Sequence, residues 1–343
     1  MDIVELKPPY LIFLGDTVEQ LSAKTGCGLV EWRRHLCTGQ LSLAGGAVDL
    51  GLPPMTLQQA VDAGVGSLII GTAAIGGGVP DGWLDTLVQA ASLGLDVVGG
   101  VHTRLNDIPP LRAAADTSGA RLVDVRVPPS NLPVGTGRKR TGRRLLTVGT
   151  DCGVGKKYTA LALEKDMRQA GLKADFRASG QTGIMIAGQG IAIDAVVSDF
   201  VSGAAELLSP DNDDDHWDVI EGQGGIFHPG YGAVSVGLLA GSQPDAFVVC
   251  HDAGRHHIWG WDGFALPSIK AVIEVTTTIG RQTNPTIRCV GVSINTSSLP
   301  PERRAGYLAD LSARIGLPCA DPLKDGTEGI VTRLRSDFPG AGG

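Results

Sequence analysis

One segment restricts the possible folds of this chain more than any other. An apolar, β-type run at residues 145–148 leads directly into Gly149-Thr150-Asp151-Cys152-Gly153-Val154-Gly155-Lys156, and a helix-compatible stretch follows as far as Gly171. This order of strand, glycine-rich loop and helix is the context of a phosphate-binding loop (P-loop). Gly153 and Gly155 let backbone N–H groups converge on one anion, while the helix N-terminus and the Lys156 ammonium supply positive charge. The segment therefore predicts an anion site within an α/β domain.

Short apolar runs alternate with helix-compatible segments on both sides of this loop. Before the loop, strands are predicted at residues 10–14, 40–43, 67–70, 96–98 and 121–127, with helices at 18–23, 57–63, 82–93 and 108–117. From the loop onward, strands are predicted at residues 145–148, 174–178, 195–197, 219–221, 246–250 and 289–294, with helices at 156–170, 199–208, 231–239, 266–278 and 300–315. Alternation of this kind is typical of parallel sheets covered by helices on both faces.

Residues 128–144 interrupt the alternation and predict a linker, because proline and glycine are frequent there. Its basic residues are interpreted as solvated charges: Arg138, Lys139, Arg140, Arg143 and Arg144. The alternative is that one or two of them reach a phosphate of the ligand. A length of 343 residues is too great for one ordinary core. We therefore predict two α/β domains, one in residues 1–135 and the other in residues 136–343.

Composition excludes several classes of protein. Acidic residues number 36 against 29 basic ones, a formal net charge of −7, whereas a nucleic-acid coat needs a basic surface. The chain starts with acidic residues where a signal peptide would have basic ones, and it has no uninterrupted apolar run of about 18 residues. The 6 cysteines include no Cys-x-x-Cys pair, which argues against a disulfide scaffold or a zinc ribbon. We expect a cytoplasmic protein that binds neither nucleic acid nor a membrane.

The loop departs from the P-loop pattern G-x-x-x-x-G-K-[S/T] in ways that bear on metal binding. Thr150 stands in place of the first glycine, and Lys157 replaces the hydroxyl residue that ligates magnesium. Thr159 lies two residues further on, about 200° around a helix, and is a poor substitute. Two adjacent lysines favour the binding of a phosphate without a metal ion. The alternative interpretation of the whole segment is a glycine-rich turn that binds no ligand. The predicted cofactor-binding residues are Thr150, Asp151, Cys152, Gly153, Val154, Gly155, Lys156 and Lys157.

A second loop supports the first. Asp218-Val219-Ile220-Glu221 ends a predicted strand, and Gly222-Gln223-Gly224-Gly225 follows. In P-loop proteins an acidic residue at the end of a neighbouring strand faces the phosphates, and the glycines permit a close approach of the backbone. The alternative is an exposed carboxylate before a tight turn.

Together the two loops resemble those of dethiobiotin synthetase and its relatives. A wider resemblance covers nearly the whole chain through Leu14-Gly15-Asp16, Ala23-Lys24-Thr25, Gly71-Thr72-Ala73 with Gly76-Gly77, Ser179-Gly180-Gln181-Thr182-Gly183 and Ile193-Asp194-Ala195-Val196. These segments are similar to a bacterial and archaeal family, long described as a domain of unknown function, whose members act as D-glutamate N-acetyltransferases. The resemblance implies a Rossmann-like parallel sheet followed by a P-loop NTPase-like parallel sheet. It also implies acetyl-CoA as the co-substrate and a role in D-glutamate catabolism.

Acetylation of an amine sets requirements for the site. The ammonium must lose a proton, the thioester carbonyl needs an electrophilic partner, and the carboxylates of the substrate need cations. Asp194, Glu221 and His251 are the predicted acid–base or orienting groups, because each follows an apolar run and ligands bind at the carboxyl ends of parallel strands. Guanidinium groups suit carboxylates, and the resemblance adds two residues of the first domain. The predicted substrate-binding residues are thus Lys24, Thr25, Arg177 and Arg255.

Other functions remain as alternatives. An ATP- and magnesium-dependent ligase or kinase of the dethiobiotin-synthetase type would keep both loops but needs the hydroxyl that Lys157 replaces. A nucleotide-binding regulator without catalysis would also keep them, whereas an oxidoreductase is disfavoured because no G-x-G-x-x-G follows a strand.

Three further expectations complete the interpretation. We expect no resident metal, because His251, His256 and His257 lack the H-E-x-x-H spacing. Cys152 is interpreted as a small filler residue, although its place in the loop would suit a lowered thiol pKa. A homo-oligomer is the commonest default for a protein of this kind.

Overall fold

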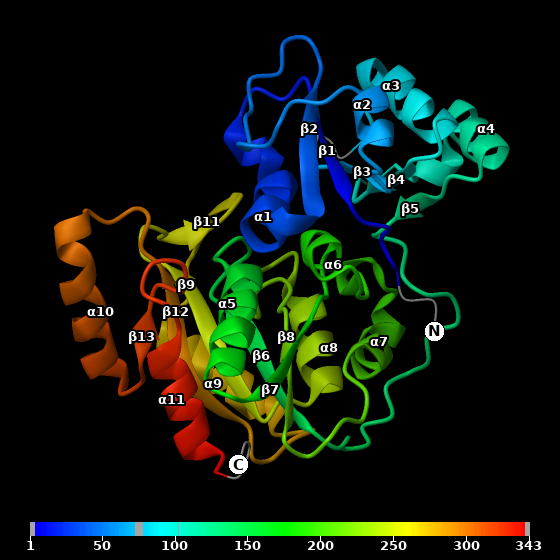
Figure 1. Ribbon diagram of the computed structural model, residues 1–343. Coiled ribbons are helices and arrows are strands. Elements are labelled where there is room, and N and C mark those ends of the chain that lie inside the picture. The colour runs from blue at the N-terminus through cyan, green and yellow to red at the C-terminus, as the bar shows by residue number, and fades with distance from the viewer. Residues whose placement is uncertain (1–3, 73–77, 102, 340–343) are drawn as a thin grey trace. The chain divides into compact units, whose positions relative to one another are not determined.

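The computed structural model describes residues 4–72, 78–101 and 103–339. The chain forms two compact units, Met1–Pro129 with Gly180–Ala192 and Ser130–Ser179 with Ile193–Gly343, and each has its own parallel sheet (Figure 1). The predicted class, two α/β domains, is confirmed. The division after Pro129 falls inside the predicted linker, but residues 180–192 belong to the first unit, which no local pattern indicated. Of the segments that carry the family resemblance, Ala73, Gly76 and Gly77 lie outside the described residues.

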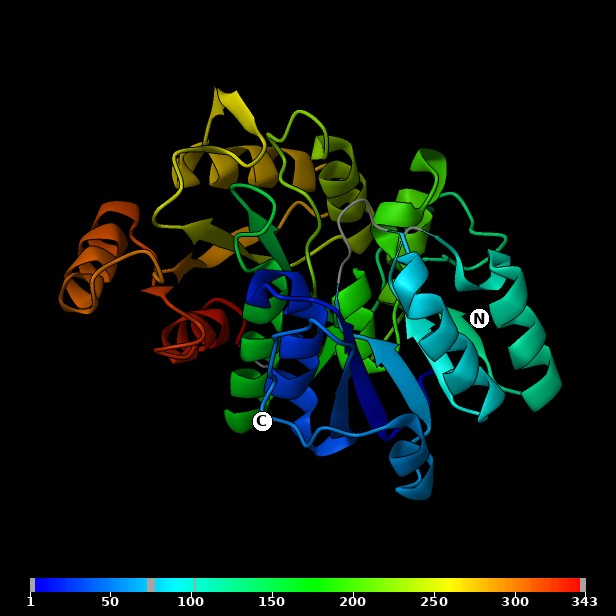
Figure 2. The same cartoon turned by 90° about the horizontal axis from the view of Figure 1, so that it is seen from above.

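The first unit is built on a five-stranded parallel sheet in the order β2-β1-β3-β4-β5. Its strands are β1 (Tyr10–Gly15), β2 (Cys37–Ser42), β3 (Ser67–Ile70), β4 (Asp96–Gly99) and β5 (Leu122–Asp124). Its helices are η1 (Gln20–Ala23), α1 (Lys24–Arg33), η2 (Arg34–Leu36), α2 (Leu57–Asp62), α3 (Asp81–Ser92), η3 (Leu105–Asp107), α4 (Pro109–Ser118) and α6 (Gln181–Ala187). Helices α3 and α4 pack side by side (Figure 2). All five strands were predicted, with ends that differ by a few residues.

Two helices of this unit, α1 and α6, were not predicted. Helix α1 contains Gly26 and Gly28, and glycine lowers helix propensity. A Cβ at Gly26 would lie 2.9 Å from Leu50 Cδ1, so glycine lets the helix pack closely. Helix α6 packs against α1, and Thr182 Oγ1 lies 3.1 Å from Thr25 Oγ1. Tertiary contacts therefore stabilise both helices despite their weak local signals.

The second unit is built on a six-stranded parallel sheet in the order β13-β12-β9-β6-β8-β7. Its strands are β6 (Arg143–Gly149), β7 (Lys173–Arg177), β8 (His216–Ile220), β9 (Ala246–Asp252), β12 (Arg288–Asn295) and β13 (Cys319–Ala320). Its helices are α5 (Lys156–Gln169), η4 (Ile193–Ala195), η5 (Ser198–Phe200), α7 (Val201–Leu208), α8 (Gly232–Ser242), α9 (Ile269–Gly280), α10 (Pro301–Ile315) and α11 (Glu328–Asp337). Because β6 pairs with both β8 and β9, the loops that follow these three strands meet at one edge.

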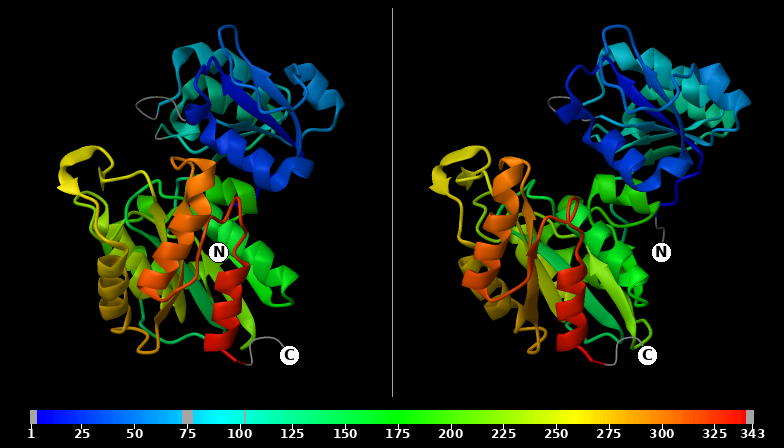
Figure 3. Two further views of the ribbon diagram at one scale, coloured as in Figure 1. Left: turned by 90° about the vertical axis from the view of Figure 1, so that its left-hand side faces the viewer. Right: turned by 60° about the vertical axis from the view of Figure 1, so that its left-hand side comes forward.

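The strand order places helices on both faces of this sheet. The connection from β6 to β7 passes over β8 towards one edge of the sheet. The connection from β8 to β9 passes over β6 towards the opposite edge. Since such crossovers are right-handed, α5 and α8 lie on opposite faces (Figure 3). Helix α11 packs on α5, while α7 and α9 pack on α8. The strand order reverses at β6, and the crevice beside its carboxyl end is where open α/β sheets bind ligands.

The basic residues before β6 are not all solvated, which corrects the prediction for the linker. Arg144 is completely buried and donates to Ser209 Oγ at 2.8 Å, and this hydroxyl donates to Asp218 at 2.6 Å. Arg140 is also buried and donates to the carbonyl oxygen of Gly241 at 2.8 Å. Burial lowers the pKa of Arg140 to about 10, so the side chain stays charged at neutral pH. The acceptors come from distant parts of the chain, and composition alone does not reveal them.

Several short elements of the second unit differ from the prediction. Residues 195–197 were predicted as a strand, but the 3₁₀ helices η4 and η5 occupy this region. An antiparallel hairpin of β10 (His257–Ile258) and β11 (Trp261–Ala265) follows β9 and was not predicted. The short strand β13 and the polar helix α11 were also missed, because such segments carry little periodic signal. None of the helices in the described part of the chain has the length and apolarity needed to cross a bilayer.

Gly203 of α7 allows the linker to lie directly against the helix. A Cβ at Gly203 would lie 1.9 Å from the carbonyl oxygen of Pro133. We expect Gly203→Ala to lower the free energy of unfolding by about 1–3 kcal/mol, as overpacking does, measured from the midpoint of urea unfolding. Gly306→Ala in α10 is the control, because nothing lies within 4 Å of the added Cβ, and it should stabilise by about 1 kcal/mol. Equal midpoints for the two variants would contradict this packing.

Candidate functional site

The loop between β6 and α5 has the backbone geometry that a bound anion requires. Gly153 (φ 64°) and Gly155 (φ 96°) adopt left-handed conformations, which glycine enters without steric cost. Gly155 is also the N-cap residue of α5, so the first N–H groups of this helix lack intrahelical partners at the loop. An anion placed there meets these donors and the positive end of the helix dipole.

The Lys156 ammonium joins the two glycine-rich loops. Its side chain is almost completely buried, and Nζ donates to the carbonyl oxygens of Asp151 at 2.8 Å and Gly224 at 2.6 Å. Burial lowers the pKa of Lys156, although the nearby charge of Glu221 acts in the opposite direction. A bound anion would favour the charged ammonium further, because opposite charges stabilise each other most where water is excluded.

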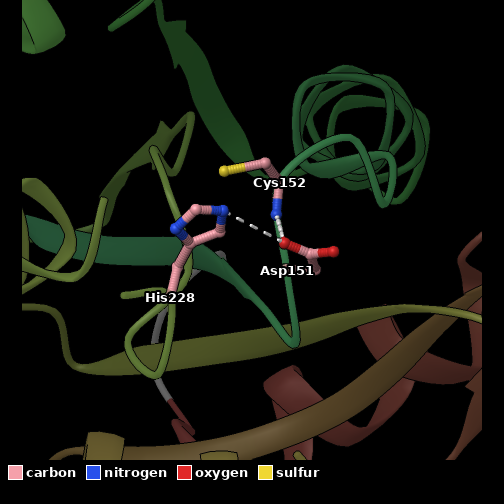
Figure 4. Close-up of side chains that lie close together, drawn as sticks. All are labelled: Asp151, Cys152 and His228. Atoms are coloured by element: carbon pink, nitrogen blue, oxygen red, sulfur yellow. Dashed lines mark hydrogen bonds and ion pairs between the residues drawn. The ribbon is translucent and has the colours of Figure 1, made fainter. Parts of the chain in front are cut away.

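The Asp151 carboxylate is completely buried and is held by donors from several segments. Oδ1 accepts from the Cys152 N–H at 2.6 Å, and Oδ2 accepts from Arg255 Nη1 at 2.9 Å and from the Trp259 N–H at 2.8 Å. His228 Nε2 lies 3.8 Å from Oδ1 (Figure 4). These contacts tie the loop after β8 and the β10–β11 hairpin to the phosphate loop.

Arg255, a predicted substrate ligand, contacts the phosphate loop itself. Besides Asp151, its guanidinium donates to the carbonyl oxygens of Cys152 at 2.5 Å and Gly153 at 3.5 Å. The side chain therefore supports the loop in this structure, and its role as a carboxylate clamp stays a prediction.

Glu221 lies beside the phosphate loop, at the end of β8. Its Oε2 accepts from the Ser179 N–H at 3.1 Å, and Ser179 Oγ donates to the Glu221 carbonyl oxygen at 2.5 Å. Gln223 Nε2 donates to the same hydroxyl at 2.9 Å. A Cβ at the neighbouring Gly222 would lie 3.1 Å from Lys156 Cδ, which shows how closely the two loops approach each other.

His251 reaches the loop from the other side of β6, at the end of β9. Its Nδ1 lies 3.1 Å from Thr150 Oγ1, and the Thr150 N–H donates to the Cys250 carbonyl oxygen at 3.0 Å. Burial lowers the pKa of His251 below 6.5. The imidazole is therefore neutral at pH 7, the form that accepts a proton in general base catalysis.

The hydroxyl needed for magnesium is missing from the position where a P-loop supplies it. Lys157 occupies this position, and its ammonium lies 4.4 Å from the ring centroid of Tyr158. Thr159 Oγ1 donates to the Gly155 carbonyl oxygen at 3.0 Å and shares a 2.7 Å hydrogen bond with Ser293 Oγ. Thr159 is thus buried in other contacts, and neither residue offers the magnesium ligand of a nucleotide-hydrolysing site.

The other predicted catalytic and substrate-binding residues lie in different surroundings. Asp194 is exposed in η4, so it does not end a strand as the prediction assumed. Arg177 donates from Nε to Asp218 Oδ1 at 2.9 Å, within an ion pair of the second sheet. Lys24 is exposed at the start of α1, and Thr25 contacts Thr182 in the first unit. Their roles in catalysis and substrate binding stay predictions.

Cys152 is half-buried in the loop, and burial raises the pKa of its thiol despite the nearby Lys156. The loop context suited a lowered pKa, but desolvation outweighs the positive charge. The thiol therefore stays protonated at neutral pH, as a filler residue would.

Three side chains at the loop were not predicted as site residues: His228, Ser179 and Gln223. Ser179 lies in a segment that carries the family resemblance, and Gln223 lies within the second glycine-rich loop. His228 follows that loop closely, and this proximity was its only signal.

The fold and the loop define a two-unit α/β protein with a P-loop-type anion site. Residues 133–331 match a family described as "Domain of unknown function (DUF1611_C) P-loop domain", and residues 41–128 match its Rossmann-like partner, DUF1611_N. The chain belongs to the DUF1611 family, with a Rossmann-like first unit and a P-loop second unit. The family resemblance inferred from the motifs is confirmed.

Full-length relatives and a solved structure agree with this assignment. Proteins from Tritonibacter scottomollicae and from a Pseudoalteromonas species, both named D-glutamate N-acetyltransferase, are each 45% identical to this chain, over 329 and 331 residues. The alignments cover 96% of this chain and 99% and 100% of these relatives. The crystal structure of a DUF1611 family protein from Anabaena variabilis is similar, with a TM-score of 0.84, 32% identity and coverage of 96% of this chain and 99% of that chain.

Replacement of the buried lysine tests the anion site directly. We expect Lys156→Met to weaken the binding of inorganic pyrophosphate at least about 10-fold, because a charge-assisted hydrogen bond is lost. Isothermal titration calorimetry measures this change. Lys165→Met on the exposed side of α5 removes the same charge and should leave the affinity nearly unchanged. Equal losses in both variants would point to a general electrostatic effect instead of a specific contact.

The lowered pKa of His251 predicts a pH-dependent contribution to stability. The native state takes up this proton less readily than the unfolded chain, whose histidine titrates near 6.5. The stabilisation is therefore complete above about pH 6.5 and is lost as the pH falls towards the lower pKa of the native state. Between about pH 7.5 and pH 5.5, wild-type protein should lose more stability than His251→Gln in urea unfolding. Parallel losses in the two proteins would contradict the burial of a neutral imidazole.

Proposed function

We propose that this protein is an N-acetyltransferase that transfers the acetyl group of acetyl-CoA to the amino group of D-glutamate. The observation that carries the proposal is the 45% identity to two D-glutamate N-acetyltransferases over almost the whole of each chain. A shared fold alone would not support an activity. The two alignments cover 96% of this chain and therefore include both units.

The phosphate loop supports CoA as the acetyl carrier. CoA presents a pyrophosphate and a 3′-phosphate, and neither needs a metal ion for the reaction. The loop offers backbone N–H groups, the N-terminus of α5 and the buried Lys156, all of which suit a phosphate. Lys157 and the buried Thr159 leave the usual magnesium position without a hydroxyl. These features favour a phosphate-bearing ligand that is held and not hydrolysed.

The residues at the strand ends suit acetyl transfer to an amine. The amine nitrogen attacks the thioester carbonyl carbon, the C–S bond breaks, and the proton lost by the amine balances the thiolate of the leaving CoA. His251 is neutral at pH 7 and lies at the start of the loop, so it is the group we assign as proton acceptor. Glu221, on the other side of β6, holds Ser179 and contributes negative charge beside Lys156. A negative charge there also favours an ammonium substrate.

The assay that tests the proposal is the release of free CoA thiol from acetyl-CoA, with D-glutamate, L-glutamate or no amino acid in parallel samples. We expect thiol release with D-glutamate and a much lower rate in the other two. His251→Gln should lower kcat about 100-fold or more, in the range typical of a lost general base. No thiol release with any amino acid would overturn the proposal.

An ATP- and magnesium-dependent ligase or kinase is the alternative function, because both glycine-rich loops are compatible with it. Calorimetry with CoA and with Mg-ATP separates the two functions. We expect CoA to bind and Mg-ATP to bind weakly, since the magnesium hydroxyl is absent. Tight Mg-ATP binding without CoA binding would favour the alternative, and phosphate release from Mg-ATP would then be measured.

A further inference from the structure

Three different side chains of the second unit lie close together, and none of them is assigned a proton transfer in the proposed reaction. Asp151, Cys152 and His228 offer ligand atoms that all lie within 4.8 Å of one another (Figure 4). Carboxylate, thiolate and imidazole are groups that zinc accepts. The cluster is therefore either a metal site or a support for the phosphate loop, and the hydrogen bonds around it distinguish the two.

The first evidence is the tautomer of His228. Its Nδ1 accepts the backbone N–H groups of Gly230 and Tyr231, each at 3.1 Å. A ring nitrogen that accepts hydrogen bonds carries a lone pair, so the proton of the neutral imidazole resides on Nε2. Metal binding through Nε2 would move this proton to Nδ1, where it would oppose two N–H donors. The backbone therefore fixes His228 as an Nε2–H donor.

The second evidence is the environment of the Asp151 carboxylate. This side chain already accepts from Cys152, Arg255 and Trp259, and the Arg255 guanidinium brings a positive charge within 2.9 Å. A cation bound to the same carboxylate would be repelled by that guanidinium in a site where little water screens the charges. The carboxylate is thus arranged to receive N–H groups of the protein.

We infer that His228 is a positioning residue: its Nε2–H group donates to the Asp151 carboxylate when the ligand binds and so holds the phosphate loop in its ligand-bound shape. Nε2 is completely buried, has no hydrogen-bond partner among the described residues, and faces Asp151 Oδ1 at 3.8 Å. An unpaired buried N–H is costly. A movement of less than about 1 Å would bring the two atoms within hydrogen-bond distance. Such a movement on anion binding would give Nε2–H the hydrogen bond that it lacks.

The position of Asp151 also determines the position of the Lys156 ammonium, because the ammonium donates to the Asp151 backbone. The Asp151 carbonyl oxygen accepts from Lys156 Nζ at 2.8 Å, and Gly224 provides the other acceptor. A Cβ at Gly225 would lie 3.1 Å from Asp151 Cα, so the loop that carries His228 packs directly on Asp151. A displaced Asp151 would thus displace the Lys156 ammonium as well.

The ring of His228 is held in place by two aromatic side chains. Tyr231 lies 4.6 Å from it with a tilted ring, and Trp261 of β11 lies 4.6 Å from it in an edge-on arrangement. These rings exclude water from the imidazole, whose side chain is fully buried. The hairpin and the loop after β8 therefore fix the direction of the Nε2–H bond.

Two substitutions at this position separate the donor from the acceptor. His228→Asn keeps an oxygen near the position of Nδ1 for the backbone N–H groups but lacks a group at the position of Nε2. His228→Gln keeps an N–H group at that far position. We expect His228→Asn to weaken the binding of CoA and of inorganic pyrophosphate about 10-fold, and His228→Gln to recover most of the affinity. The KM for acetyl-CoA should rise by a similar factor, while the KM for the amino acid stays unchanged.

His257→Asn on β10 is the matched control, because it makes the same change at an exposed histidine and should leave both affinities unchanged. Wild-type pyrophosphate affinity in His228→Asn would overturn the inference. So would equal losses in the Asn and Gln variants together with a lower melting temperature, because these would show a structural role only. Stoichiometric Co²⁺ binding, with a thiolate charge-transfer band that Cys152→Ala removes, would show a metal site and overturn it as well.

The inference rests on the proposed function only in taking CoA as the ligand of the loop, and the two fail separately. If wild-type protein releases no thiol from acetyl-CoA but His228→Asn still weakens pyrophosphate binding, the proposed function fails and the positioning role stands. If wild-type protein acetylates D-glutamate and His228→Asn binds CoA and pyrophosphate normally, the positioning role fails and the function stands.

Discussion

The contact on which the rest of the site depends joins the Lys156 ammonium to two backbone carbonyl oxygens, one from each glycine-rich loop. A buried ammonium is tolerated only where acceptors surround it, and its lowered pKa reflects the cost of burial. The same ammonium lies at the N-terminus of α5, where the backbone favours an anion. Loop shape, cation and helix N-terminus therefore form one electrostatic arrangement, in which a change in one part alters the others.

The order of strands in the second sheet gives this arrangement its chemical groups. Because β6 lies between β8 and β9, Glu221 and His251 reach the loop from opposite sides. The loop thus combines a backbone geometry that suits an anion with a neutral imidazole and a buried carboxylate. A nucleotide-hydrolysing protein needs a hydroxyl on magnesium at this point, and this chain has Lys157 instead. This difference is the reason why we propose a phosphate-bearing carrier, and not a hydrolysed nucleotide, as the ligand of the loop.

Sequence reasoning located most of the strands and the loop because these features are encoded locally. Apolar runs of the right length mark strands, and Gly153 and Gly155 mark backbone conformations that other residues avoid. Glu221 and His251 were found by one further rule, that the ends of parallel strands meet at one edge. This rule did not predict His228, because the proposed role of His228 depends on the N–H groups of Gly230 and Tyr231 and on the carboxylate of Asp151. Asp194 was chosen because it follows an apolar run, but this run leads into the 3₁₀ helix η4 and not to a strand of the sheet.

The sequence by itself determined the α/β class, the phosphate loop with its missing magnesium hydroxyl, and membership of the family. Each of these resides in residue types and short spacings, which act through local backbone preferences. Only the tertiary structure decided that Arg144 is buried, that Arg255 holds the loop, and that residues 180–192 belong to the first unit. Those outcomes depend on which polar groups lose water and which distant acceptors replace it, and that balance exists only when the chain is packed.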